Sequence, residues 1–290
     1  MLRLYCYNFR MPPKHPLAIP RKPQGIVTRG KTARNRLRQV DNFLLLYEPS
    51  LIARRDSSLF VDLGYGAEAF TTLETAMRFR KLNPDLKILG VEIEPERVAA
   101  GLPFADERTF FRLGGFNLPI EPGETVRAIR TFNVLRQYNE AEVLPAWEQM
   151  AHYVQPGGLM IEGTSNPTGA IWAANLLRRV ETGWHKEALV FFTNFHQGFD
   201  PLEFQTILPK NYIHRVTPGE KIFDFFSAWK AAAAETSPLQ TWGLRQWFAG
   251  TAEALSRRGY TINLRRKWLS KGWLIWENPE TEPHPGLVKV

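Results

Sequence analysis

The residues best suited to chemistry are two acids and two glycines. Asp62, Gly64 and Gly66 follow a short apolar run, Leu59 to Val61, and Glu92 closes the next apolar run. Glycines between a strand and a helix leave backbone N–H groups free and let a ligand approach the main chain closely. An acid at the end of the following strand can accept both hydroxyls of a ribose. The spacing therefore predicts a site for a nucleoside-containing cofactor.

Apolar runs that alternate with helical patterns must position these residues. We expect strands at 59–61, 88–91, 110–111, 126–132, 159–161 and 188–195, with helices at 32–48, 67–81, 140–154 and 168–179. Asn139 is expected to cap the helix over 140–154. In the helix after the glycine turn, the buried stripe is expected to be Phe70, Leu73 and Met77. Alternating strands and helices predict an α/β fold, a mostly parallel sheet with helices on both faces.

In such sheets ligands bind at the carboxyl ends of the strands. That rule gathers five polar side chains around one crevice: Asp62, Glu92, Asn117, Asn133 and Glu162. Glu162 is a candidate base or substrate ligand, and a salt bridge to an arginine such as Arg130 or Arg136 is an equally good interpretation.

Two further residues have alternative interpretations. Asn133 is a candidate for contacting the substrate or the cofactor, or alternatively a helix cap. Tyr138 is a weaker candidate for the same role, or a packed aromatic.

The composition narrows the class of protein. The chain has 290 residues, 44% of them hydrophobic, and its only cysteine is Cys6. It therefore has no internal disulfide, and a reducing compartment such as the cytoplasm is expected. We find no secretory signal, no apolar run long enough for a membrane span and no metal-ligand spacing.

Positive charge is concentrated at the N-terminus. Residues 1–56 hold twelve Lys/Arg and three Asp/Glu, and the rest of the chain is nearly neutral. We expect a basic arm over 1–36 and one domain over 37–290, with a core at 57–200 and a helical, aromatic addition at 201–290. Residues 273–276 of that addition are a candidate last strand of the sheet. The arm is suited to RNA or a phosphorylated metabolite, or is simply a solvated tail.

Four segments together resemble the motifs of class I S-adenosylmethionine-dependent methyltransferases. Residues 62–66 resemble the D-x-G-x-G motif, and 90–98 resemble the segment in which an acid closes the second strand. Residues 133–135 resemble the fourth-strand segment of small-molecule members, and 155–159 resemble the L-x-P-G-G turn. More loosely, the chain is similar to uncharacterised methyltransferase-like bacterial proteins. The resemblance implies a Rossmann-like sheet of seven strands.

The resemblance also implies roles for the cofactor residues. Asp62 would hold the ammonium group of S-adenosylmethionine, and Gly64, Tyr65 and Gly66 would form the turn that the cofactor approaches. Glu92 would accept the ribose hydroxyls.

On the adenine side, Ile93 would pack on the ring. Family members often carry an acid after the third strand, where this chain has Phe116 and Asn117. Asn117 is the expected substitute.

Three functions follow as hypotheses. The first is methyl transfer from S-adenosylmethionine to an RNA or small-molecule acceptor. The second is a non-catalytic scaffold that binds cofactor or RNA. The third is a NAD-dependent oxidoreductase, because residues 64–69 also fit G-x-G-x-x-G/A; Asp62 favours the methyl donor.

Overall fold

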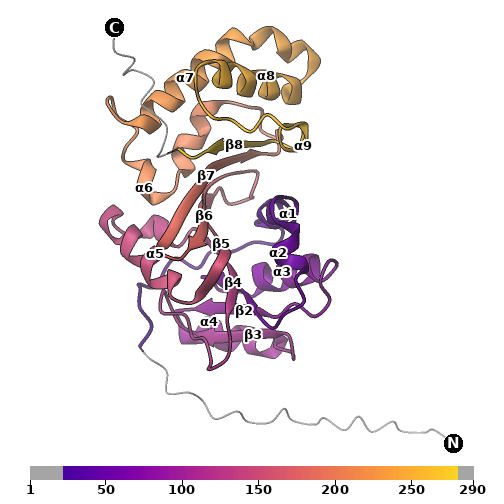
Figure 1. Cartoon of the computed structure of the whole chain (residues 1–290), viewed down its shortest axis with the longest axis vertical. Helices are drawn as coiled ribbons and strands as arrows, with labels where there is room; N and C mark the ends of the chain where they lie inside the picture. Colours follow the sequence, from indigo (N-terminus) through magenta and orange to yellow (C-terminus); the bar gives the residue numbers. More distant parts are fainter. Residues whose placement is uncertain (1–21, 280–290) are drawn as a thin grey trace, which may run out of the picture.

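An eight-stranded sheet runs through the molecule in the order β3-β2-β1-β4-β5-β6-β7-β8 (Figure 1). The computed structural model describes residues 22–279, so Cys6 and residues 1–21 of the expected arm lie outside the described residues. The strands are β1 Leu59–Leu63, β2 Ile88–Glu92, β3 Thr109–Leu113, β4 Val126–Phe132, β5 Val154–Ser165, β6 Ile171–Val180, β7 Gly183–Thr193 and β8 Trp273–Glu277.

Strands β1 to β5 are all parallel, which confirms the Rossmann-like α/β fold. Their order, 3-2-1-4-5, is that of a sheet wound outward from β1 in both directions. Every residue of β1, β2 and β4 is buried, because helices cover both faces of a parallel sheet. Strands β6, β7 and β8 are added by antiparallel pairing, so the sheet has eight strands where seven were expected.

Helices form layers on the two faces and around the last strands (Figure 1). The α-helices are α1 Arg38–Tyr47, α2 Pro49–Ala53, α3 Phe70–Phe79, α4 Pro95–Gly101, α5 Val143–Ala151, α6 Lys210–Ile213, α7 Lys221–Glu235, α8 Leu244–Arg257 and α9 Arg266–Leu269. The 3-10 helices are η1 Leu102–Phe104, η2 Leu135–Gln137, η3 Glu140–Glu142, η4 Pro201–Ile207 and η5 Ser237–Trp242.

Aromatic side chains fix these layers to the sheet. Phe43 of α1 packs on Trp172 of β6 and Trp273 of β8. On the other face, Phe225 of α7 stacks on Trp276 with ring centroids 4.2 Å apart. The expected last strand at 273–276 is therefore confirmed as β8, and it joins the C-terminal helices to the sheet.

The expected helix at 168–179 is wrong, because most of that segment is strand β6. The turn before it is built by Asn166, whose Oδ1 accepts the N–H of Ala170 at 2.9 Å, and by Gly169 with φ +71°. The chain therefore reverses and pairs β6 with β5. Seven consecutive residues of β6 are buried, and a strand covered on both faces has no alternation that would distinguish it from a buried helix.

The expected apolar stripe of α3 is wrong at Met77, whereas Phe70 and Leu73 are half-buried. Met77 is 61% exposed, whereas Thr71, Thr72 and Thr75 are buried. These hydroxyls donate hydrogen bonds to Asp62 and Asp41 in the interior. The threonine face of the helix lies inward, because burying a carboxylate is costly unless hydrogen-bond donors satisfy it.

The sequence also predicted a helix cap correctly. Asn139 begins η3 in a capping box with Glu142, as the sequence indicated. Among residues 22–279, the helices are all too short or too polar to cross a bilayer.

Candidate functional site

The turn after β1 depends on glycine. Gly64 has φ +74° and Gly66 has φ +95°, both in the left-handed region. A Cβ on Gly64 would collide with Val134, and one on Gly66 would lie 2.7 Å from the carbonyl oxygen of Gly30. Tyr65, between them, is buried, and its hydroxyl donates to the carbonyl of Arg97 at 2.9 Å. The turn is thus held rigidly at the carboxyl end of β1.

Asp62 lies beneath this turn, in an ionic cluster of the interior. Its carboxylate accepts from the hydroxyls of Thr71 and Thr72 at 2.8 and 2.9 Å. Nε of Arg130, on β4, donates to the other oxygen at 3.1 Å. Arg130 also pairs with the buried Asp41 of α1. The charge that the sequence assigned to a cofactor's ammonium group is therefore already compensated by a guanidinium of this chain.

Glu92 ends β2 directly beside the glycine turn. Its carboxylate accepts the N–H groups of Gly66 and Ile93, each at 2.9 Å, and is 3.4 Å from Nη1 of Arg97. Only 1% of the residue is exposed. The structure thus brings Glu92 and the turn together as the sequence spacing required. Arg97 was not singled out from the sequence, although it lies in segment 90–98, which resembles the second-strand motif.

Residues 22–32, here called the strap, lie across this crevice. On the β3 side, Phe116 donates its N–H to the carbonyl of Gln24 at 2.9 Å. The N–H of Gln24 donates to Oδ1 of Asn117 at 2.6 Å, and that of Ile26 to the hydroxyl of Tyr138 at 2.6 Å. The polar groups expected to contact cofactor or substrate thus bind the strap.

The second half of the strap lies on the glycine turn. Ala67 donates its N–H to the carbonyl of Gly30 at 2.9 Å, and Nη2 of Arg97 donates to the carbonyl of Thr28 at 2.7 Å. The strap also passes over Ile93, since a Cβ on Gly25 would lie 3.3 Å from its Cδ1. No periodicity in the sequence indicated these contacts, because the segment is neither helix nor strand.

The strap leaves little space in the crevice. A cavity of about 20 Å³ remains, bounded by the strap, the glycine turn, Glu92, Phe116 and Tyr138. Pockets for small-molecule ligands and cofactors usually measure about 300–1,000 Å³. The residue types fit a nucleoside cofactor, but with the strap in place the cavity is too small to hold one.

Asn133 follows β4 in a strained conformation. Its φ is +62°, which is uncommon for a residue other than glycine and often marks a functional position. Its amide accepts the N–H of Ser165 at 3.0 Å and donates to the Ser165 hydroxyl at 3.2 Å. Asn133 thus ties the end of β4 to the end of β5 beside the crevice.

The Glu162 carboxylate contacts a side chain of β6 and none of the residues at the glycine turn. It is fully buried on β5 and accepts from Nδ2 of Asn175, on β6, at 2.7 Å. The same Nδ2 is 3.0 Å from Oδ1 of Asn211 on α6. Burial raises the pKa of the Glu162 carboxyl to about 7, against hydrogen bonding from Asn175 and the charge of Lys186. Its contacts lead toward α6, and neither suggested arginine, Arg130 or Arg136, pairs with it.

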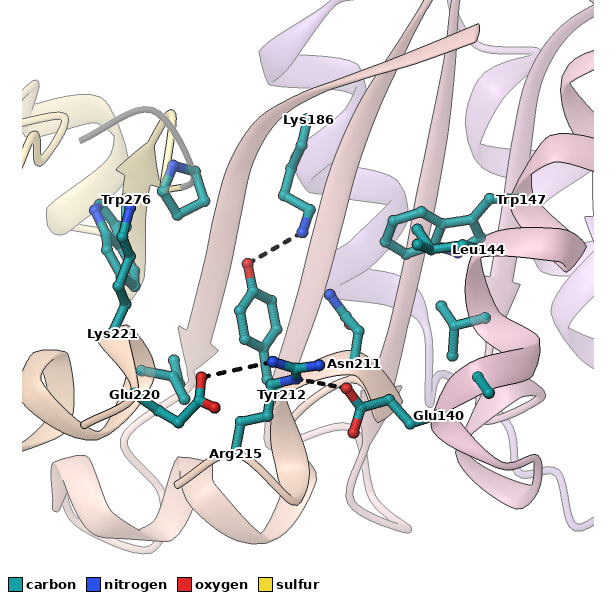
Figure 2. A pocket seen from close by; sticks show the side chains of 14 residues that line it. Glu140, Leu144, Trp147, Lys186, Asn211, Tyr212, Arg215, Glu220, Lys221 and Trp276 are labelled. Atoms are coloured by element: carbon teal, nitrogen blue, oxygen red, sulfur yellow. Dashed lines mark hydrogen bonds and ion pairs between the residues drawn. The ribbon is translucent and has the colours of Figure 1, made fainter. Parts of the chain in front are cut away.

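A larger pocket lies over that side of the sheet. It measures about 690 Å³ and is bounded by residues of α5, α6, α7, β7 and β8 (Figure 2). Lys186, which is buried, donates to the hydroxyl of Tyr212 at 3.1 Å and lies near the ring of Trp147. Arg215 lies between Glu140 and Glu220 at the rim. Lys186 lies in the polar first part of β7, before the strand expected at 188–195, so the sequence did not mark this pocket.

Within residues 22–279, no group of three or more His, Cys, Asp or Glu side chains is arranged to hold an ion.

The comparisons with known proteins gave matches among solved structures only. No protein-family model matches the chain, and neither does any curated protein. The N-methyltransferase NodS from Bradyrhizobium japonicum WM9, in complex with S-adenosyl-L-homocysteine, is 18% identical, covering 45% of this chain and 62% of that one, with TM-score 0.33. The plantazolicin methyltransferase BpumL, also with S-adenosyl-L-homocysteine, is 12% identical over 45% and 47%, with TM-score 0.35.

Human N-acetylserotonin methyltransferase in complex with S-adenosylmethionine is 25% identical over 44% of this chain and 36% of that one, with TM-score 0.30. The chain thus spans between 36% and 62% of the length of these three structures. All three TM-scores are below 0.5, so these likenesses assign no activity to the chain. The function must come from the geometry of the crevice.

Proposed function

We propose that the crevice binds S-adenosylmethionine and that the chain transfers its methyl group to an RNA or small-molecule acceptor. The observation that carries this proposal is the hydrogen bond of 2.9 Å between the Gly66 N–H and Glu92. It joins the glycine turn after β1 to the acid that ends β2, which is the pairing that a ribose-binding site needs. Ile93 and Phe116 supply apolar surface beside it.

S-adenosylmethionine, when bound, supplies an already activated methyl group, so the protein mainly has to orient the acceptor and exclude water. Glu92 would accept the ribose hydroxyls, and Asn133 and Tyr138 would contact the acceptor. Asp62 would act on the cofactor only weakly, since Arg130 compensates its charge. Glu162 as a base would require the acceptor to approach from the α6 side.

Cofactor entry requires the strap to leave. Its departure would free the N–H groups of Phe116 and Ala67, Nη2 of Arg97 and the hydroxyl of Tyr138, which donates to the carbonyl of Ile26 at 3.3 Å. Each of these donors would lose a hydrogen bond unless a ligand replaced the strap. A polar ligand that satisfies the same donors is therefore the natural competitor of residues 24–30.

Calorimetric titration with S-adenosylmethionine, S-adenosylhomocysteine and NAD tests the proposal. We expect the two sulfur compounds to bind and Glu92→Gln to weaken their binding by about 10- to 100-fold, the range for losing hydrogen bonds to a charged group. Glu235→Gln, an exposed acid on α7, is the matched control and should bind as the wild type does. Binding of NAD alone would replace methyl transfer by the oxidoreductase hypothesis.

Opening the strap should raise cofactor affinity. Gly25 has φ +137°, and an added Cβ would lie 2.6 Å from the Tyr138 hydroxyl, so Gly25→Ala disfavours the closed strap. Because apparent affinity scales with the open fraction, we expect about tenfold tighter binding of S-adenosylhomocysteine and faster tryptic cleavage at Arg29 and Lys31.

Gly123→Ala is the control for this experiment. That position also has positive φ, but nothing lies within 4 Å of the added Cβ. It should leave both affinity and cleavage unchanged. Faster cleavage of Gly25→Ala without any gain in affinity would show that the strap does not limit cofactor entry.

A second candidate function is a non-catalytic scaffold. The small cavity and the compensated Asp62 favour it, since both describe a crevice that is satisfied without a ligand. Absence of binding to both the wild type and Gly25→Ala, with the proteins folded, would select the scaffold.

A further inference from the structure

Three arginines belong to separate segments that lie beside the crevice. Arg29 belongs to the strap, Arg36 to the turn before α1, and Arg136 to η2 after β4. The backbone N–H of Arg29 donates to Oε1 of Gln137, next to Arg136, at 3.1 Å. Nε of Arg36 donates at 3.0 Å to the Ser165 hydroxyl, which also accepts from Asn133. The group therefore lies by the carboxyl ends of β4 and β5.

No carboxylate compensates these charges within residues 22–279. The partners of the Arg36 guanidinium are neutral oxygens: the Ser165 hydroxyl and the carbonyls of Lys31, Ser165 and Asn166. Arg29 and Arg136 make no ion pair in the same part of the chain, and no acid occurs between residues 22 and 40. Burial and the charge of Arg136 lower the pKa of Arg36, and burial and Arg29 lower that of Arg136.

We propose that Arg29, Arg36 and Arg136 form an anion site for a phosphate or carboxylate group of the acceptor. Like charges held together destabilise one another, and a bound anion removes that repulsion. Guanidinium forks match the geometry of phosphate and carboxylate oxygens. The site lies next to Asn133, whereas Glu92 and Phe116 border the cofactor side. Only the assignment of the anion to a methyl acceptor rests on the proposed function.

Titration with inorganic phosphate and with acetate at low ionic strength tests the site. We expect saturable binding by the wild type, and a loss of about tenfold or more in affinity for Arg29→Gln/Arg136→Gln. Arg136 makes no side-chain hydrogen bond within the described residues, so this variant should fold, which circular dichroism checks. Arg266→Gln, an exposed arginine on α9, is the control and should bind as the wild type does.

The results of these titrations distinguish the anion site from the proposed cofactor site. Preferential binding of phosphate indicates a phosphorylated acceptor, and preferential binding of acetate a carboxylated one. Absence of binding by the wild type, or equal binding by the double variant, overturns the anion site. S-adenosylhomocysteine affinity, measured on the same samples, should not fall in the double variant. Failure of that binding alone would refute the proposed function and leave the anion site standing.

Discussion

Arg130→Met is expected to lower the free energy of unfolding by about 3–5 kcal/mol, the usual cost of removing one partner from a buried ion pair. Arg130 and Asp41 are fully buried, and Asp62 is 2% exposed. The Asp62 carboxylate lies 2.8 Å from Nη2 of Arg130, its only cationic partner among the described residues. Burial alone would lower the pKa of Arg130, but Asp41 and Asp62 outweigh it and raise that pKa. Methionine would leave Asp62 buried with only hydroxyl donors.

Urea denaturation followed by circular dichroism measures this loss. Arg55→Gln is the control, because its ion pair with Asp85 is 65% and 73% exposed and should contribute less than about 1 kcal/mol. Adding Asp62→Asn to Arg130→Met should recover part of the loss, since the amide carries no charge. A loss no larger than that of the control would contradict a cluster that depends on Arg130.

This ionic cluster shows why the sequence did not predict the partners of Asp62. A D-x-G-x-G pattern suggests an acid that faces a ligand, but the pattern does not show whether a cation of the same chain reaches the acid first. Arg130 is 68 positions away, and one sequence gives no pairing over such a separation. The same cluster explains why the threonine face of α3 is buried, since the hydroxyls of these threonines donate hydrogen bonds to Asp41 and Asp62.

Features fixed by neighbouring residues were predictable. Strands β1 to β5, the glycine turn, the capping box at Asn139 and the last strand all depend on short patterns of apolar and turn residues. The strap was not predictable, because its hydrogen bonds run from one irregular segment to residues about 40 to 110 positions later. The sequence therefore located the crevice but not the peptide that fills it.

Replacing Glu162 by glutamine is expected to make the protein more stable at alkaline pH. The pKa of this carboxyl rises from 4.5 to about 7 on folding, so the folded state holds the proton more tightly than the unfolded state. That contribution is complete below pH 4.5 and is lost as the pH rises through about 7. At about 1.4 kcal/mol per pKa unit, the wild type should lose about 3 kcal/mol from this group between pH 5 and pH 8.

Glutamine resembles the protonated acid and still offers an oxygen to Nδ2 of Asn175. Glu162→Gln should therefore match the wild type at pH 5 and exceed it at pH 8 in urea denaturation. Glu235→Gln on α7 should keep the pH dependence of the wild type, because an exposed carboxylate paired with Arg257 and Arg258 stays ionised throughout this range. Equal slopes for Glu162→Gln and the wild type would mean that Glu162 stays ionised in the folded protein. A carboxylate buried on the α6 side would then need a cation, and Lys186, whose charge already acts on it, is the group the structure offers.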